Sequence, residues 1–217
     1  LERLGLTDNT LVIFSSDNGP ENTGSPSRRN VDDESTGPGL GSFASVGTTG
    51  GHRGRKRSLL QGGIGVPFIA RWPGRIAAGK VDDTTPITAV DLLPTFCDIA
   101  GVELPEGYEP VGVSQLPALL GTAGAKRAKP IFWHWRTANS RGDNWPALAV
   151  RQGDWKLLLG KEAGRVELFR VPDDRVEQVN LRDEYPEVVR RLSRLCDTWQ
   201  ETLPENANEE CFSKQRD

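Results

Sequence analysis

The chain has 217 residues, which is enough for one ordinary domain or for a domain with a small satellite. Its net charge of −3 provides no strong positive field, so nucleic acid is not an expected partner. No apolar run approaches the roughly 18 residues that span a bilayer. We therefore expect no membrane span, and the 24 glycines and 15 prolines predict many loops.

The chain is expected to open on the end of a helix, which Gly5 stops, followed at once by a strand. Residues 11–14 read LVIF, and a short apolar run that ends at Gly and Pro predicts a buried strand. The sequence contains no methionine, even at position 1. These features together indicate the C-terminal piece of a longer protein.

Residues 15–20, which read SSDNGP, follow this first strand directly. In open α/β sheets, ligands bind outside the carboxyl ends of the strands. Asp17 and Asn18 there offer a carboxylate and an amide oxygen, the ligands that Ca²⁺ and Mg²⁺ prefer. Asn-Gly is also the strongest short turn signal, so a plain turn is the alternative.

Further along, the pattern predicts a long polar loop over 21–57, a strand over 66–72 and a helix over 91–101, with Asp91 as its N-cap. Residues 131–135, 147–151, 155–159 and 166–170 are short apolar runs separated by turn residues. They predict a small antiparallel sheet of four strands. Apolar residues at helical spacing over 185–203 predict a terminal helix that packs on that sheet.

The second informative stretch is residues 54–67, GRKRSLLQGGIGVP. Its glycines let the backbone approach a ligand closely, and Lys56 could bind an anion together with Arg53, Arg55 and Arg57. A solvated basic loop is the alternative. His52 precedes Lys56 by four positions and is a candidate hydrogen-bond donor to a substrate, or else a surface histidine.

Two further side chains have open roles. His134 lies between two tryptophans on a predicted strand, so it points opposite to the indoles, either into a cleft or into a structural position. Trp145 and the polar run at 137–144 are candidate contacts for a sugar.

In order along the chain, these motifs resemble the type I sulfatase family, the arylsulfatase-like hydrolases of the alkaline-phosphatase superfamily. The resemblance rests on SDNGPE at 16–21 and on the pattern G-x-K-x4-QGGI-x-VP-x-I-x-x-WPG at 54–74. Later segments agree as well, namely VDLLPT at 90–95, VRQGDWKL at 150–157, ELF at 167–169 and EQVNL at 177–181. Gln61 and Gly65 replace the Glu and Arg that are commoner in the family.

The resemblance implies an α/β fold: residues 1–128 form the C-terminal part of the catalytic α/β sandwich, and residues 129–217 form a small α+β subdomain. It implies that Asp17 and Asn18 ligate Ca²⁺, with Mg²⁺ as the second choice, and that Lys56 binds the sulfate. The family's nucleophile is a formylglycine made from a Cys/Ser-x-Pro/Ala-x-Arg motif. Residues 1–217 contain no such motif, so we expect it in a preceding segment.

The implied activity is hydrolysis of sulfate esters, with a sulfated small molecule or polysaccharide as substrate. We expect the chain alone to be inactive, because the nucleophile lies elsewhere. A formylglycine-generating enzyme or anaerobic maturase would be a partner, and family habit indicates a periplasmic or secreted protein. The alternatives are a phosphate or phosphonate ester hydrolase of the same superfamily and a non-catalytic protein that binds anions or carbohydrates.

Overall fold

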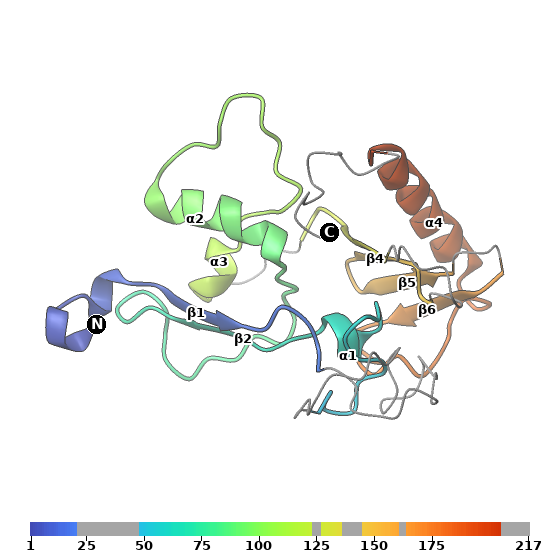
Figure 1. The fold of residues 1–217 in the computed structure, drawn as a ribbon, viewed down its shortest axis with the longest axis horizontal. Helices are drawn as coiled ribbons and strands as arrows, with labels where there is room; N and C mark the ends of the chain where they lie inside the picture. The colour runs from blue at the N-terminus through green and yellow to red at the C-terminus, as the bar shows by residue number, and fades with distance from the viewer. Residues whose placement is uncertain (21–47, 123–126, 136–144, 161–163, 205–217) are drawn as a thin grey trace, which may run out of the picture.

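The computed structural model describes residues 1–20, 48–122, 127–135, 145–160 and 164–204. Two short 3-10 turns, η1 (Glu2–Leu4) and η2 (Thr7–Asn9), precede the first strand. Gly5 ends η1 with φ 63°, a left-handed conformation that glycine adopts without strain. Two sheets follow: one of two strands, and one of four strands with α4 beside it (Figure 1).

The first sheet pairs β1 (Val12–Ser15) antiparallel with β2 (Phe68–Arg71), so both predicted strands are confirmed. The prediction that the first strand is buried is wrong for the described structure. Phe14 is 63% exposed and its cross-strand neighbour Ile69 is 58% exposed. Burial needs a covering element as well as apolar residues, and this face of the ribbon is open within the described residues.

The predicted helix near residue 91 is confirmed as α2 (Leu92–Ala100), which is preceded by η3 (Ala89–Asp91) and stopped by Gly101 at φ 66°. Asp91 stands at the N-cap position of α2, as predicted, but its side chain makes no capping hydrogen bond to that helix. Its buried carboxylate accepts hydrogen bonds from Thr88 and Val113 and pairs with Arg127. Asp91 therefore ties α2 to the segment that follows α3 (Leu116–Leu119).

The second sheet is an antiparallel meander of β3 (Ile131–His134), β4 (Leu148–Gln152), β5 (Trp155–Leu159) and β6 (Val166–Arg170). Gly153 makes the tight turn between β4 and β5 with φ 58°. The four strands match the four predicted runs.

Each face of this sheet is buried against a different part of the chain. On one face, α4 (Pro186–Glu201) packs Leu192 and Cys196 against a row of apolar strand residues, Leu148, Val150, Leu157 and Leu168. This confirms the predicted packing of the terminal helix. Stacking of Phe132 on Trp199, with ring centroids 4.8 Å apart, extends the contact to the edge strand.

On the opposite face, Ala149, Leu158 and Phe169 pack against Leu59 and Leu60. These two leucines immediately precede α1 (Gln61–Ile64). Figure 1 accordingly shows α4 and α1 on opposite sides of the sheet. Trp145 belongs to the same cluster and is 2% exposed, so the suggestion that it contacts a sugar is wrong. The polar run at 137–144, named with it, lies outside the described residues.

Within the described part of the chain, no helix combines the length and apolar character that crossing a membrane requires. The boundary predicted between residues 128 and 129 falls between α3 and β3, and it stays a prediction.

Glycines allow the segments around α1 to pack backbone against backbone. A Cβ atom on Gly19 would lie 1.8 Å from the carbonyl oxygen of Gly62. A Cβ on Gly62 would in turn lie 2.2 Å from the carbonyl oxygen of Gly54. Such distances are far shorter than van der Waals contact, so these segments can approach one another only because side chains are absent there.

Gly62→Ala should therefore destabilise the fold by about 1–3 kcal/mol, because overpacking forces backbone shifts. Urea unfolding of the purified protein measures the change. Gly160→Ala is the matched control, since its Cβ would meet its nearest neighbour at 3.4 Å, an ordinary contact. Equal stability of the two variants would contradict the packing described for Gly62.

Cys196 provides a probe of the packing between α4 and the sheet. Burial raises the pKa of its thiol to about 12, with a smaller contribution from Asp197. In a variant with Cys97 and Cys211 replaced by Ser, Cys196 should resist a thiol-reactive dye at pH 8 until urea unfolds the protein. Reaction at the rate of a free thiol in the native state would show that α4 does not cover Cys196.

Candidate functional site

A pocket of about 790 Å³ lies where β1 ends and α1 begins. We call it the β1 pocket. Three separate segments line it, namely Ser16, Asn18, Gly19 and Pro20 after β1, Thr48, Thr49, Gly50, His52 and Lys56 before α1, and Gln61, Gly65, Val66 and Pro67 from α1 onward. It therefore brings together two of the motifs that the sequence singles out.

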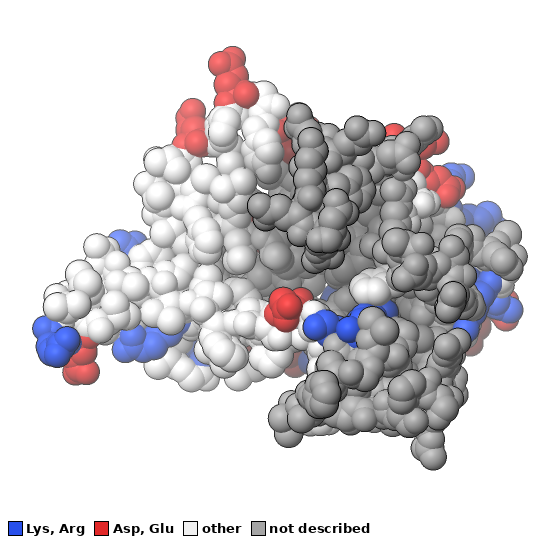
Figure 2. Space-filling model, viewed as in Figure 1, with Lys and Arg blue, Asp and Glu red and all other residues white. Residues whose placement is uncertain are grey.

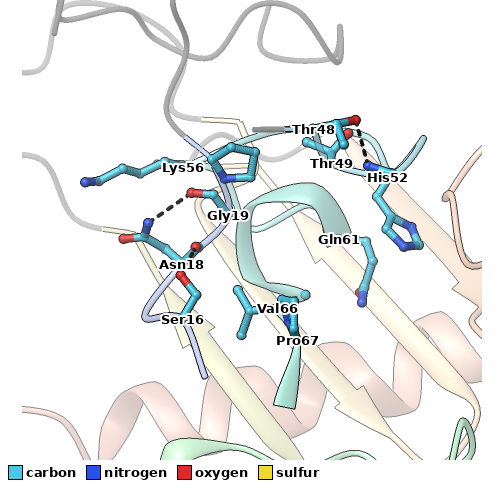
Figure 3. A pocket seen from close by; sticks show the side chains of 13 residues that line it. Ser16, Asn18, Gly19, Thr48, Thr49, His52, Lys56, Gln61, Val66 and Pro67 are labelled. Atoms are coloured by element: carbon cyan, nitrogen blue, oxygen red, sulfur yellow. Dashed lines mark hydrogen bonds between the residues drawn. The ribbon is translucent and has the colours of Figure 1, made fainter. Parts of the chain in front are cut away.

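The Asp-Asn pair forms the wall next to β1. The carboxylate of Asp17 accepts the backbone N–H of Asn18 at 2.9 Å, and Asp17 is exposed beside the pocket rather than among its lining residues. The amide nitrogen of Asn18 donates to the carbonyl oxygen of Gly19 at 3.0 Å. This bond turns the amide oxygen of Asn18 away from Gly19, as Figure 3 shows.

Lys56 is held next to this pair by its backbone, because its N–H donates to the carbonyl oxygen of Pro20 at 3.0 Å. Gly19 donates in the same way to Gly63 at 2.9 Å, so the β1 end is tied to both α1 and the lysine loop. Figure 3 shows the side chains of Lys56 and Asn18 extending toward the same side of the pocket. An ammonium group and an amide oxygen thus share one cavity.

His52 lines the same pocket, but its ring is anchored elsewhere. Its Nδ1 lies 2.8 Å from the carbonyl oxygen of Arg175, which can only accept, so Nδ1 carries the proton. Figure 3 shows the ring at the opposite end of the pocket from the Lys56 amine. The proposed contact of His52 with a substrate stays a prediction. Nε2 is the ring atom left for it, and that atom accepts in the neutral ring and donates only when both nitrogens are protonated.

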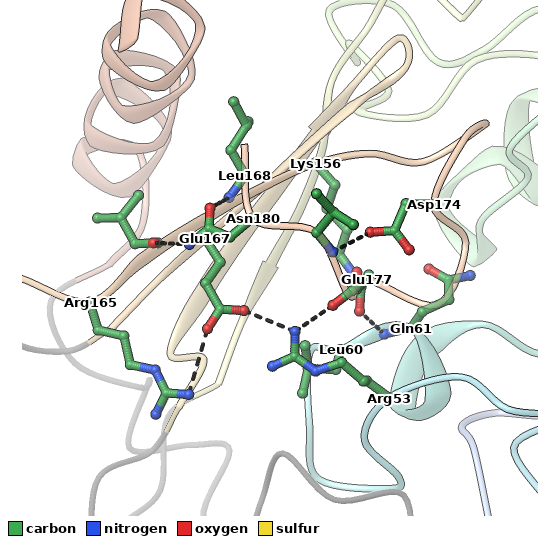
Figure 4. A network of polar contacts seen from close by, with 12 residues as sticks. Arg53, Leu60, Gln61, Lys156, Arg165, Glu167, Leu168, Asp174, Glu177 and Asn180 are labelled. Atoms are coloured by element: carbon green, nitrogen blue, oxygen red, sulfur yellow. Dashed lines mark hydrogen bonds and ion pairs between the residues drawn. The ribbon is translucent and has the colours of Figure 1, made fainter. Parts of the chain in front are cut away.

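Two members of the basic run at 53–57 lie in different places, so the joint anion site predicted for the run stays a prediction. Arg53 points to the second sheet, where it bonds the carboxylate of Glu167 at 3.0 Å and the carbonyl oxygen of Glu177 at 2.5 Å (Figure 4). Lys56 is the member of this run that lines the β1 pocket. The spacing of these residues in the sequence does not show that Arg53 contacts the second sheet while Lys56 lines the pocket.

Sequence reasoning also missed the buried pair behind the pocket. Lys156 and Glu177 are each 1% exposed, with Nζ and Oε1 2.5 Å apart. Burial lowers the pKa of the Lys156 amine, and the charge of Glu177 opposes that shift. A lysine in the middle of an apolar strand is a signal for such a partner, because lysine is almost never fully buried unpaired.

His134 lies on the face of the sheet that α4 covers, with its ring 6.2 Å from that of Trp199. Trp133 packs on the other face, so the predicted alternation is confirmed. His134 thus lies on the face opposite the one that packs against Leu59 and Leu60, and it is not among the residues that line the β1 pocket.

Both signs of charge meet near the pocket. Figure 2 shows an acidic and a basic group of atoms close together at the centre of the view, in the area where Figure 1 places the end of β1 and α1. Among the described residues, no group of three or more His, Cys, Asp or Glu side chains could hold a metal ion. Ca²⁺ takes six to eight oxygen ligands, so Asp17 and Asn18 would supply only part of such a site.

Known proteins are similar to this chain over most of its length. Residues 1–102 match the Sulfatase family. The chain is 27% identical to an N-acetylgalactosamine-6-O-sulfatase of Bacteroides thetaiotaomicron over 91% of its own length, and 35% identical to human arylsulfatase A over 70%. It spans 38% of the first relative and 25% of the second.

The fold of the chain is also similar to solved structures. A structure from work on glycosaminoglycan metabolism by Bacteroides thetaiotaomicron matches 93% of the chain with a TM-score of 0.65 and 26% identity, and 41% of that protein is covered. The protein Ps i-CgsB, solved in complex with k-i-k-neocarrahexaose, matches 92% with a TM-score of 0.63 and 26% identity, and 38% of it is covered. With the family match and the similar sulfatases, these likenesses show that the chain belongs to the sulfatase family.

Proposed function

We propose that this chain is the part of a sulfuric ester hydrolase that binds the sulfate group and contributes ligands to a catalytic Ca²⁺. One observation carries the proposal: Lys56 and Asn18, which come from different segments, line one pocket and extend to the same side of it. Family membership makes sulfate the anion of choice.

Lys56 would bind the non-bridging oxygens of the sulfate ester. Cleavage of the ester increases negative charge on these oxygens and on the leaving oxygen, and a preorganised ammonium stabilises that charge. The backbone bond from Lys56 to Pro20 fixes the start of this side chain against the Asp-Asn segment. Lysine acts as a compact point charge with three donors, which suits a tetrahedral anion that has several oxygens.

The donor chemistry of Asp17 and Asn18 fits Ca²⁺. Both offer hard oxygen ligands, and the Asn18 amide is already oriented by its bond to Gly19. A bound Ca²⁺ would supply Lewis-acid stabilisation of the sulfate oxygens. The remaining ligands must come from outside this pair. Because residues 1–217 contain no Cys/Ser-x-Pro/Ala-x-Arg motif, the nucleophile must also come from another segment.

A carbohydrate sulfate is the proposed substrate class. Two similar proteins support this choice: the relative from Bacteroides thetaiotaomicron is an N-acetylgalactosamine-6-O-sulfatase, and Ps i-CgsB was solved with k-i-k-neocarrahexaose. The pocket has the size for a single sugar unit with its sulfate, since ligand sites usually span about 300–1,000 Å³.

Replacing Lys56 by Ala tests the sulfate-binding role. In the full-length protein, matured with its formylglycine-generating enzyme, Lys56→Ala should lower kcat/KM for 4-nitrophenyl sulfate by about 10²–10³-fold, the usual effect of losing one preorganised charge. The control is Lys80→Ala, because Lys80 is exposed and is not among the pocket-lining residues. Unchanged activity of the Lys56 variant would mean that this lysine does not bind the reacting group.

Comparison of substrates separates the candidate activities. The full-length protein should cleave 4-nitrophenyl sulfate and N-acetylgalactosamine 6-sulfate faster than 4-nitrophenyl phosphate. Preference for the phosphate ester would identify a phosphohydrolase instead. Binding of the sulfated sugar without turnover, in protein shown by mass spectrometry to carry formylglycine, would identify a non-catalytic binding protein.

Calcium removal tests the Asp-Asn pair. A chelator should abolish activity and lower the Tm, and added Ca²⁺ should restore both, because a bound ion stabilises the folded state. In Asn18→Ala, half-maximal recovery should need at least about tenfold more Ca²⁺, since even indirect supports of a metal site typically contribute 10–100-fold in affinity. The same Ca²⁺ dependence in wild type and variant would remove Asn18 from the ligand set. Better recovery with Mg²⁺ would reassign the ion.

A further inference from the structure

Glu177 connects two walls of the β1 pocket to the second sheet, although it lies in the connection between β6 and α4. Its Oε2 accepts the backbone N–H of Gln61 at 2.7 Å, and Gln61 begins α1 and lines the pocket. Its backbone carbonyl oxygen accepts Nη1 of Arg53 at 2.5 Å, and Arg53 lies on the loop between His52 and Lys56. One residue therefore holds both the α1 wall and the lysine loop.

The other carboxylate oxygen of Glu177 fixes it to the sheet. Oε1 lies 2.5 Å from Nζ of Lys156, and both side chains are 1% exposed. Lys156 belongs to β5, which has a hydrogen-bonded strand on each side. Glu177 is thus attached to a central strand, so its position is set by the sheet and not by the surface.

Neighbouring contacts strengthen the same connection. Arg53 also bonds Glu167 on β6 at 3.0 Å, and its guanidinium carbon lies 5.8 Å from the ring centroid of Phe169. The N–H of Gly62 donates back to the carbonyl oxygen of Arg53 at 2.6 Å, which closes the loop onto α1 (Figure 4 shows the polar contacts around Glu177). Glu177 itself has φ 61°, an uncommon conformation for a non-glycine residue. Such conformations persist where surrounding contacts hold them.

We propose that Glu177 is a positioning residue for the sulfate site: through Gln61 and Arg53 it sets where the Lys56 loop stands against the Asp17–Asn18 segment. This inference rests on the proposed function. It assigns to the second sheet a part in catalysis, although Glu177 and Lys156 are not among the residues that line the pocket. A shift of about 1 Å in a catalytic group can cost about 100-fold in rate, so the position of the loop has a measurable consequence.

Two double variants of the full-length protein isolate this effect. Lys156→Met with Glu177→Met removes both buried charges and the acceptor for the Gln61 N–H. Lys156→Met with Glu177→Gln removes the same charges but keeps an acceptor of the same length. The Met/Met variant should have a kcat/KM for 4-nitrophenyl sulfate about 10–100-fold below that of wild type. If the loss is about 100-fold, the kcat/KM of the Met/Gln variant should be at least about tenfold higher than that of the Met/Met variant.

A merely structural role predicts a different result. It predicts a lower Tm in both variants with equal kcat/KM per folded molecule. Asp91→Asn is the control for destabilisation, because it disturbs the buried Asp91–Arg127 pair, whose members are not pocket residues. It should lower the Tm without lowering kcat/KM.

Adding Lys56→Ala to each background gives the decisive comparison. If Glu177 positions the lysine loop, Lys56→Ala should cost clearly less in the Met/Met variant than in wild type, because coupled residues are not additive. If Lys56→Ala lowers kcat/KM as much in the Met/Met variant as in wild type, the positioning role is overturned and the proposed function stands. No loss from Lys56→Ala in wild type overturns the proposed function itself.

Arg53→Met covers the case in which the Met/Met variant does not fold. It leaves the Lys156–Glu177 pair intact and releases the loop from Glu177 and Glu167. The same reduction in kcat/KM, and in the effect of Lys56→Ala, supports the proposal. Wild-type values for both overturn it.

Discussion

The buried contact between Lys156 and Glu177 is the constraint on which the rest of this structure depends. Taking two charges out of water is costly, and removing one partner of such a pair usually destabilises a protein by about 3–5 kcal/mol. One carboxylate oxygen of Glu177 contacts Lys156, and the other accepts a hydrogen bond from the backbone N–H of Gln61. Burying this pair costs electrostatic free energy, but the same pair fixes the pocket segments to the small sheet.

The second sheet is covered on both faces. The terminal helix α4 covers one face with an apolar stripe, and such tertiary packing supplies most of the stability of helices in proteins. The other face receives Leu59 and Leu60, which precede α1 and follow the loop of Lys56. The core of the small sheet and the wall of the β1 pocket thus form one packed unit. Within it, the glycines at 19 and 62 allow the segment after β1, the lysine loop and α1 to pack backbone against backbone.

Local patterns in the sequence predicted most elements of the fold. The helical spacing over 185–203 and the four apolar runs before it are signals that neighbouring residues carry, and the structure confirms them. The exposure of Phe14 could not be predicted in this way, because burial depends on a covering element that the strand's own residues do not specify. The N-cap position of Asp91 was predicted, but the partners of its carboxylate were not, since Val113 and Arg127 are distant in sequence.

The same distinction, between local signals and contacts that are distant in sequence, applies to the candidate site. Asp17, Asn18 and Lys56 were predicted from motif chemistry, whereas the hydrogen bond from Arg53 to Glu177 depends on a contact between residues 124 positions apart.

The proposed function requires Lys56 and the Asp-Asn pair to act on one sulfate. The most direct measurement is a crystal structure of the full-length protein with Ca²⁺ and a sulfated sugar. Lys56 Nζ should lie about 2.7–2.9 Å from a sulfate oxygen, and the oxygens of Asp17 and Asn18 should lie about 2.3–2.6 Å from the ion. A sulfate bound without Lys56, or an ion bound away from Asp17 and Asn18, would contradict it.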